Sequence, residues 1–100
     1  MMRTAWVPPN QILSIPYTLP PNANAVVWVL ANVPVDVFML DGQGLAAFQS
    51  NQPFVSWGGT TGLLQHHLSL LLPWRPAWHL LIRNTSSAAA NVQYELELAP

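Results

Sequence analysis

The sequence predicts an all-β fold, an antiparallel β-sandwich of the jelly-roll type with seven or eight short strands. Ten prolines and five glycines interrupt the 100 residues at short intervals, and both residue types end strands or form turns. The segments between them are rich in β-branched and aromatic residues, which favour strands. A chain of this length can bury one hydrophobic core, so we expect a single domain over residues 1–100.

The first half of the chain contains four expected strands. They cover residues 4–7, 11–19, 25–30 and 35–40. Pro16 lacks a backbone N–H donor, which predicts an edge strand or a bulge for the second of them, and Val33-Pro34 separates the third from the fourth. Gly42 and Gly44 then allow the chain to turn. Residues 45–50 are the one segment where we expect a short helical turn.

The second half has clearer strand patterns. The expected strands cover residues 54–57, 63–72, 78–83 and 91–98. The first ends at Gly58-Gly59, which permits a sharp bend and would let the Trp57 ring lie across the next strand. In residues 91–98 apolar and polar residues alternate with a period of two, which is typical of a strand with one buried face.

Charged side chains are unusually sparse. The chain has three arginines, no lysine and four acidic residues. A folded protein of this mass exposes roughly 5,600 Å², which leaves roughly 800 Å² per charge, about one partner's share of a standard interface. A whole face can therefore lack ionic groups, which favours its burial against a protein partner or a second copy. Three scattered arginines cannot follow a phosphate backbone, so nucleic acid is not an expected partner.

The sequence contains no cysteine, so disulfides and thiolate metal sites are excluded. Prolines interrupt the apolar runs of the first thirty residues before any reaches the length of a signal-peptide core, and we expect no signal peptide. No apolar run approaches the ~18 to 20 residues of a membrane span. A cytoplasmic location is the resulting expectation.

The titratable residues do not form a recognisable catalytic or metal-binding pattern. His66 and His67 are adjacent, so on a strand their side chains leave opposite faces and cannot bind one ion together. His79 adds a third imidazole, which is too few ligands for a zinc site without cysteine. No Gly-x-Ser-x-Gly motif is present, and Glu95 and Glu97 are interpreted as solvated edge charges. The expectation is a non-enzymatic protein without cofactor or metal.

The five tryptophans are the main candidates for binding. Trp28 lies in an apolar run, and Trp78 shares a strand face with Leu80 and Ile82, so both are expected in the core. Trp57 precedes a diglycine and Trp74 lies between prolines, which predicts exposure for both. Exposed indoles serve protein contacts; they also stack on sugars, so a carbohydrate-binding module is the alternative.

The predicted contact surface combines aromatic and polar residues. Its members are Trp57, Trp74, Arg75, His66 and His67. The tryptophans would supply rigid apolar area and Arg75 a bidentate anchor. The hypothesis is a non-catalytic protein-interaction or assembly module that also self-associates.

Three segments also carry a family resemblance. Residues 35–59 (VDVFMLDGQGLAAFQSNQPFVSWGG) resemble the strand–turn–strand unit of a small bacterial domain family of unknown function, sometimes fused to TIR domains. Residues 73–83 and 91–98 are similar to that family's last two strands. Family members tend to be basic around the diglycine, whereas this loop is neutral. Residues 78–98 are more loosely similar to the final hairpin of Golgi-dynamics (GOLD) and pre-peptidase C-terminal domains, which implies a partner-binding sandwich without catalytic residues.

Overall fold

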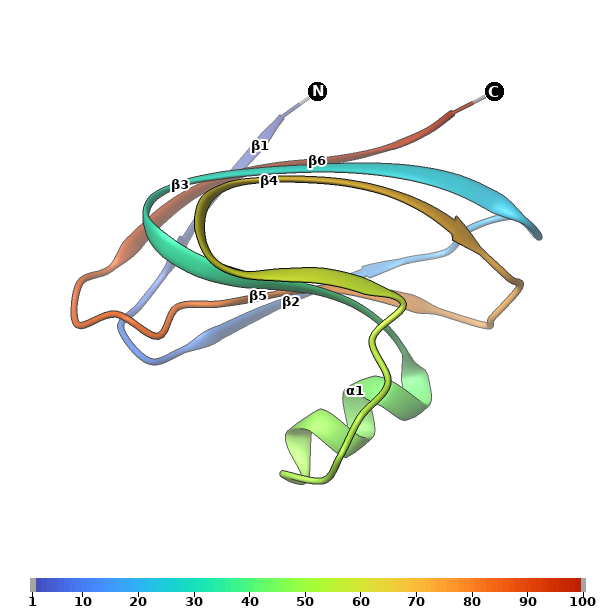
Figure 1. Ribbon diagram of the computed structural model, residues 1–100, viewed down its shortest axis with the longest axis horizontal. Coiled ribbons are helices and arrows are strands. Elements are labelled where there is room, and N and C mark those ends of the chain that lie inside the picture. The colour runs from blue at the N-terminus through green and yellow to red at the C-terminus, as the bar shows by residue number, and fades with distance from the viewer. Residues whose placement is uncertain (1, 100) are drawn as a thin grey trace.

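The computed structural model describes residues 2–99 and is built from antiparallel strands, which confirms the all-β class (Figure 1). Its elements are β1 (Arg3–Val7), β2 (Ile12–Tyr17), β3 (Ala23–Asp41), α1 (Gly42–Gln49), β4 (Gly58–Leu72), β5 (Trp78–Arg83) and β6 (Ala90–Leu98). No helix of the described residues is long and apolar enough to cross a membrane.

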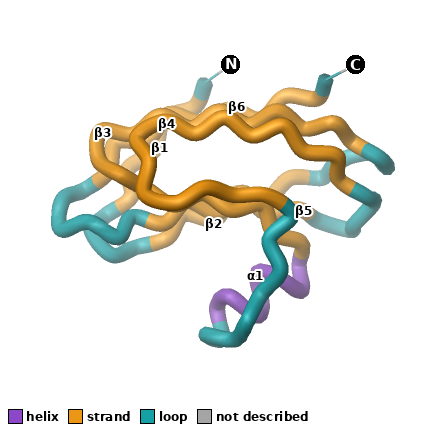
Figure 2. The backbone as a smooth tube through the Cα atoms, in the orientation of Figure 1, coloured by secondary structure: helices purple, strands orange, loops and turns teal. Residues whose placement is uncertain are grey.

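The strands form one curled sheet whose two halves face each other (Figures 1 and 2). The sheet order is β1-β6-β3-β5-β2, with β4 paired to β3. The first part of β3 pairs with β6 and its last part with β5, while β4 follows β3 through both parts. One half therefore contains β1 and β6, and the other β2 and β5, with the two long strands serving both.

The described residues contain six strands, where the sequence predicted seven or eight. The prediction that Val33-Pro34 ends a strand is wrong, since β3 continues through it. The register with β4 shifts between Leu30 and Val35 and again before Val37, so extra residues bulge there and the strand bends instead of stopping. Pro16 lies in β2, an edge strand that pairs only with β5, as predicted.

The diglycine begins a strand, whereas the sequence predicted that it ends one. Residues 54–57 are a connection and not a strand, and β4 starts at Gly58. A Cβ atom at Gly59 would lie 2.6 Å from the Val37 carbonyl oxygen and 2.9 Å from the Phe38 ring. The glycine is therefore needed for close approach of two strands. The Phe38 ring lies against Gly59, and the Trp57 ring packs edge-on against Trp78.

The hydrophobic core lies between the two halves of the sheet. Trp78, Leu80 and Ile82 of β5 are fully buried there, as their alternation predicted. The prediction that Trp28 is a core residue is wrong, because Val27 and Val29 occupy the inward positions of β3 and Trp28 is 40% exposed. Its ring stacks on the exposed His67 ring, with centroids 3.7 Å apart.

Helix α1 lies outside the core, below the half of the sheet that contains β5 (Figure 1). It begins earlier than the predicted helical turn because the Asp41 side chain caps it, accepting a 2.8 Å hydrogen bond from the Gly44 N–H. Leu81 points away from the core yet is only 1% exposed. We infer that α1 and its connection cover that outer face of the sheet.

Candidate functional site

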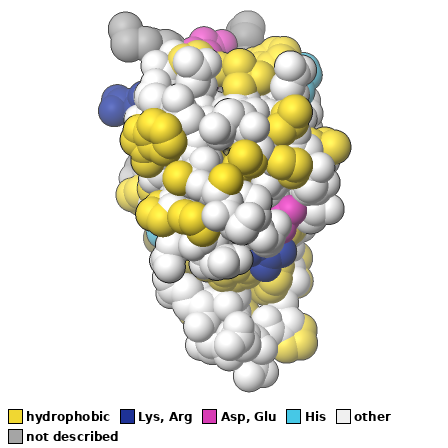
Figure 3. Space-filling view, turned by 90° about the vertical axis from the view of Figure 1, so that its left-hand side faces the viewer, with side chains coloured by type: hydrophobic (Ala, Val, Ile, Leu, Met, Phe, Trp, Pro, Cys, Tyr) yellow, Lys and Arg dark blue, Asp and Glu magenta, His cyan; other side chains and the backbone are white. Residues whose placement is uncertain are grey.

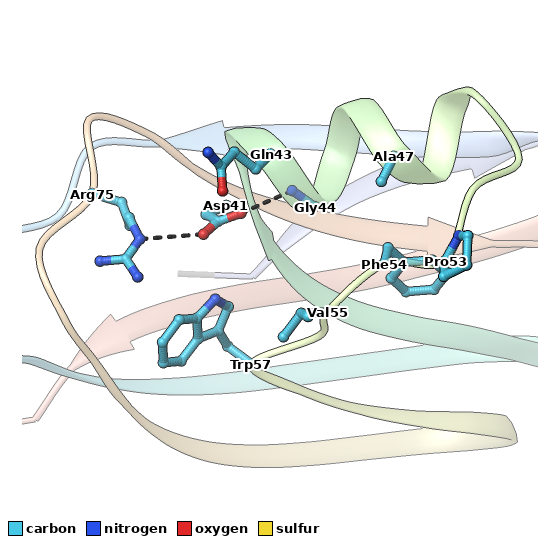
Figure 4. Close-up of a pocket in the computed structure, with 9 residues that line it drawn as sticks. All are labelled: Asp41, Gln43, Gly44, Ala47, Pro53, Phe54, Val55, Trp57 and Arg75. Atoms are coloured by element: carbon cyan, nitrogen blue, oxygen red, sulfur yellow. Dashed lines mark hydrogen bonds and ion pairs between the residues drawn. The ribbon is translucent and has the colours of Figure 1, made fainter.

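A cleft opens beside the start of α1, where β3 ends and the chain returns toward β4 (Figure 4). Its volume is about 380 Å³, and its lining residues are Asp41, Gln43, Gly44, Ala47, Pro53, Phe54, Val55, Trp57 and Arg75. A neighbouring hollow of about 570 Å³ shares Asp41, Gln43 and Arg75 and extends to Ala77. The two hollows meet at the Asp41–Arg75 pair.

Three side chains from different parts of the chain form the centre of this cleft. The Arg75 Nε donates to Asp41 Oδ2 over 3.2 Å, and the guanidinium lies 5.1 Å from the centroid of the Trp57 ring, a cation–π distance. Trp57 is held by its backbone N–H, which donates to the Met39 carbonyl over 2.9 Å. The edge-on packing of Trp57 against buried Trp78 fixes the ring further. The cluster is therefore largely formed before any partner arrives.

Asp41 stays ionised in this setting. Partial burial raises its pKa, but hydrogen bonds from the Gly44 N–H, the Arg75 guanidinium and the Trp57 side chain lower the pKa more, and the net direction is downward. The carboxylate thus serves two purposes at neutral pH, because it caps α1 and holds Arg75 over the cleft.

The structure brings three of the five predicted contact residues together. Trp57 and Arg75 line the cleft, and Trp74 lies next to Arg75 with its backbone carbonyl accepting from Arg75 Nη1. Trp57 is 37% exposed and Trp74 57%, in agreement with the predicted exposure.

The two predicted histidines do not belong to this surface. His66 is only 2% exposed because it shares the inward phase of β4 with Leu68; its ring is bonded to the Thr60 hydroxyl and to the Leu63 carbonyl. Burial lowers the His66 pKa and so favours the neutral imidazole, against the raising effect of hydrogen bonds to the Leu63 and Val35 backbone and of the Asp36 charge. His67 lies on the outer face of the other half of the sheet, against Trp28.

Sequence reasoning missed Asp41, Gln43 and Val55 as members of the site. Val55 is 70% exposed at the rim of the cleft. One signal was available, because aspartate is a typical N-cap residue, and a helix that begins at Gly42 instead of residue 45 places Asp41 at that position. The pairing of Asp41 with Arg75 joins residues far apart in sequence and carries no local signal.

No group of three His, Asp or Glu side chains suited to a metal ion occurs among the described residues.

The fold and the cleft define a small all-β protein with an aromatic, ion-paired cleft at the start of α1. No protein-family model matches the chain, and no curated protein sequence does; the resemblance to the TIR-associated family stays a prediction. Among solved structures, the chain is similar to the Yersinia pseudotuberculosis-derived mitogen, with a TM-score of 0.64 over 99% of this chain and 85% of that chain. The sequence identity is 10%, so the likeness concerns the fold alone.

Proposed function

We propose that the protein is a non-catalytic protein-interaction and assembly module whose cleft binds a segment of a partner protein. The observation that carries the proposal is the cleft itself, where exposed Trp57 and Val55 lie beside the Asp41–Arg75 pair and exposed Trp74 adjoins it through its backbone carbonyl. Aromatic residues and arginine are enriched at interface cores, where they act as rigid anchors. The cleft is suited to an apolar side chain of the partner, with polar groups meeting the ion pair.

The sparse surface charge supports the same proposal and extends it to self-association. Seven charged residues serve an accessible surface of 5702 Å², close to the area expected from the mass alone. Figure 3 shows a face on which hydrophobic side chains are interspersed with polar ones and charged groups are few. With a net charge of −1, little electrostatic repulsion opposes contact between copies.

The sugar-binding alternative needs an indole ring with an open face. His67 covers one face of Trp28, and Arg75 lies over Trp57. Trp6 and Trp74 are the more exposed rings, at 65% and 57%. Since the indole inside the cleft is already covered by a cation, a protein ligand is favoured over a carbohydrate.

The proposal is tested with peptides selected against the purified protein from a random displayed library, titrated by tryptophan fluorescence. Trp74→Ala is expected to weaken binding of the selected peptides at least tenfold. The control is Trp6→Ala in β1, which removes a tryptophan that is at least as exposed and is expected to leave binding unchanged. Equal binding by wild type and Trp74→Ala contradicts the proposal. So does a parallel titration in which oligosaccharides quench the fluorescence and peptides do not.

Two finer features belong to the same proposal. We interpret the curled sheet as a jelly-roll-like sandwich in which β3 and β4 each serve both layers, and this interpretation is supported by the core between the two halves. The cytoplasmic location expected from the sequence is part of the same proposal.

A further inference from the structure

Strand β4 has one unpaired side. It forms backbone pairs with β3, and no other strand of residues 2–99 pairs with it. Because β4 follows β3 through both halves, it forms the edge of the sheet in both, and it crosses in front of β3 in Figure 1. The outward N–H and C=O groups of such an edge can pair with another strand.

This edge lacks the protection that the other two edges carry. Strand β1 includes Arg3, and β2 includes Pro16, which has no N–H to donate. Charged residues and proline on an edge strand discourage pairing with other chains. Strand β4, GGTTGLLQHHLSLLL, contains neither an acidic or basic residue of fixed charge nor a proline, and Leu63, Leu64 and Leu71 on it are 45%, 49% and 69% exposed.

We propose that β4 pairs antiparallel with β4 of a second copy of this chain, through residues 65–72. The inference rests on the self-association part of the proposed function and assigns its surface. Residues 65–72 pair with β3 in an unbroken register, from Leu30↔Gln65 to Ala23↔Leu72, so this part of the edge is regular. The register shifts that bend the sheet lie beyond it.

A second copy fits this edge better than a different protein does, because the edge is complementary to itself. A two-fold axis across β4 sets each free N–H opposite a free C=O of the same strand. No fixed charge on β4 opposes its own image. Antiparallel pairing of residues 65–72 would form about eight backbone hydrogen bonds, within the ~10 ± 5 of a typical interface.

The alternation of side chains provides a direct test. Gln65 and Ser69 are exposed and, like Trp28 opposite His67, point to the outer face. In a continuous sheet two directly opposite residues point to the same face, so an outward residue of one copy lies opposite an outward residue of the other. In every such register centred on residues 65–72, lysines at positions 65 and 69 of one copy include at least one that lies opposite or diagonal to a lysine of the second copy. Like charges at these positions destabilise strand pairing.

The experiment measures the dimer dissociation constant by sedimentation equilibrium from micromolar to millimolar protein. Wild type is expected to dimerise, and Gln65→Lys/Ser69→Lys to dimerise at least tenfold more weakly. The matched control is Asn91→Lys/Gln93→Lys, which adds the same charge to exposed positions of β6, a strand paired on both sides. This control is expected to leave the constant unchanged.

Amide hydrogen exchange of the wild-type protein gives a second test of the β4 interface. Exchange of residues 65–72 is expected to slow at high protein concentration, while exchange in β1 and β2 does not change. A monomer at millimolar concentration overturns the inference together with the self-association part of the proposed function. If the wild type dimerises and the β4 variant and the β6 control weaken the dimer equally, or neither weakens it, only the assignment of the interface to β4 is overturned. Peptide binding at the cleft is independent of all these outcomes.

Discussion

Two aspartates on the last part of β3 each pair with an arginine, and the two pairs differ in their hydrogen bonds and in their surroundings. Asp36 accepts from Arg83 through Nε and Nη2, both over 2.9 Å, and its other oxygen accepts from the Gly62 N–H. The Asp36 and Arg83 side chains are 9% and 36% exposed. Asp41 meets Arg75 through Nε alone, beside an open cleft, and these two side chains are 14% and 37% exposed.

The surroundings of the two arginines explain the different roles. Arg83 lies over the Phe38 and Phe48 rings, 5.4 and 5.5 Å from their centroids, and so joins the sheet to α1. Through Asp36 it also ties β5 to the bend of β4 at Gly62. Arg75 covers a half-exposed tryptophan instead. The first pair is built into the fold, whereas the second is available to a ligand.

Breaking the Asp36–Arg83 pair should have the largest effect, because it holds more hydrogen bonds. Asp36→Ala leaves Arg83 without its carboxylate and the Gly62 N–H without its acceptor. We expect a loss of about 3 kcal/mol in the free energy of unfolding, the lower end for a broken buried pair because Arg83 is partly exposed. Urea denaturation measures it; a loss below about 1 kcal/mol would place this pair with ordinary surface pairs.

Breaking the cleft pair should cost less stability. Asp41→Ala removes the helix cap at Gly44 as well as the partner of Arg75. The expected loss is about 1 kcal/mol, mostly from the cap, because a single exposed ion pair adds about 0–1 kcal/mol. The same urea titration measures it, with Asp36→Ala as the reference. A loss as large as that of Asp36→Ala would remove the distinction between the pairs.

The sequence predicted strands best where polar residues marked one face. Trp78 was placed correctly because His79 and Arg83 alternate with apolar residues in its strand. Trp28 was misplaced because residues 25–30 are apolar at every position, so the pattern does not reveal which face is buried. Val33-Pro34 was read as a strand end, although its local chemistry fits a bulge on a bent strand equally well.

The candidate site was predictable only in part. Trp57 and Trp74 were recognised as exposed because glycine and proline surround them. Arg75 meets Asp41 because β3 and β5 pair at Asp41↔Trp78, which brings the loop before β5 to the end of β3. Trp57 reaches the same place because its N–H bonds to the Met39 carbonyl. Such a contact arises from the tertiary fold and has no signature in either segment.

Acid should distinguish the Asp41 charge from its capping role. Its pKa is lowered in the folded state, so the charge stabilises the fold above the usual value of 3.8, and this contribution is lost as the pH falls through the folded pKa. Asn retains capping ability, so Asp41→Asn isolates the charge. The gap in unfolding free energy between wild type and Asp41→Asn is expected to be constant from pH 7 to about pH 5 and to shrink toward pH 2. A gap that does not change with pH would show that the carboxylate charge adds nothing to stability.

The smallest expected effect on stability belongs to Arg75→Gln, and it defines the cleft pair most sharply. Gln keeps a polar side chain but loses the ion pair and the cation–π contact with Trp57. Because Arg75 is partly exposed and contacts Asp41 through one nitrogen, the free energy of unfolding should change by no more than about 0.5 kcal/mol. Affinity for the selected peptides should nevertheless fall at least tenfold, since the partner then meets an unpaired carboxylate at the centre of the cleft. A residue that serves only the fold would change stability and leave the affinity of the folded protein unchanged. A large stability loss with unchanged affinity would therefore assign Arg75 the same role as Arg83.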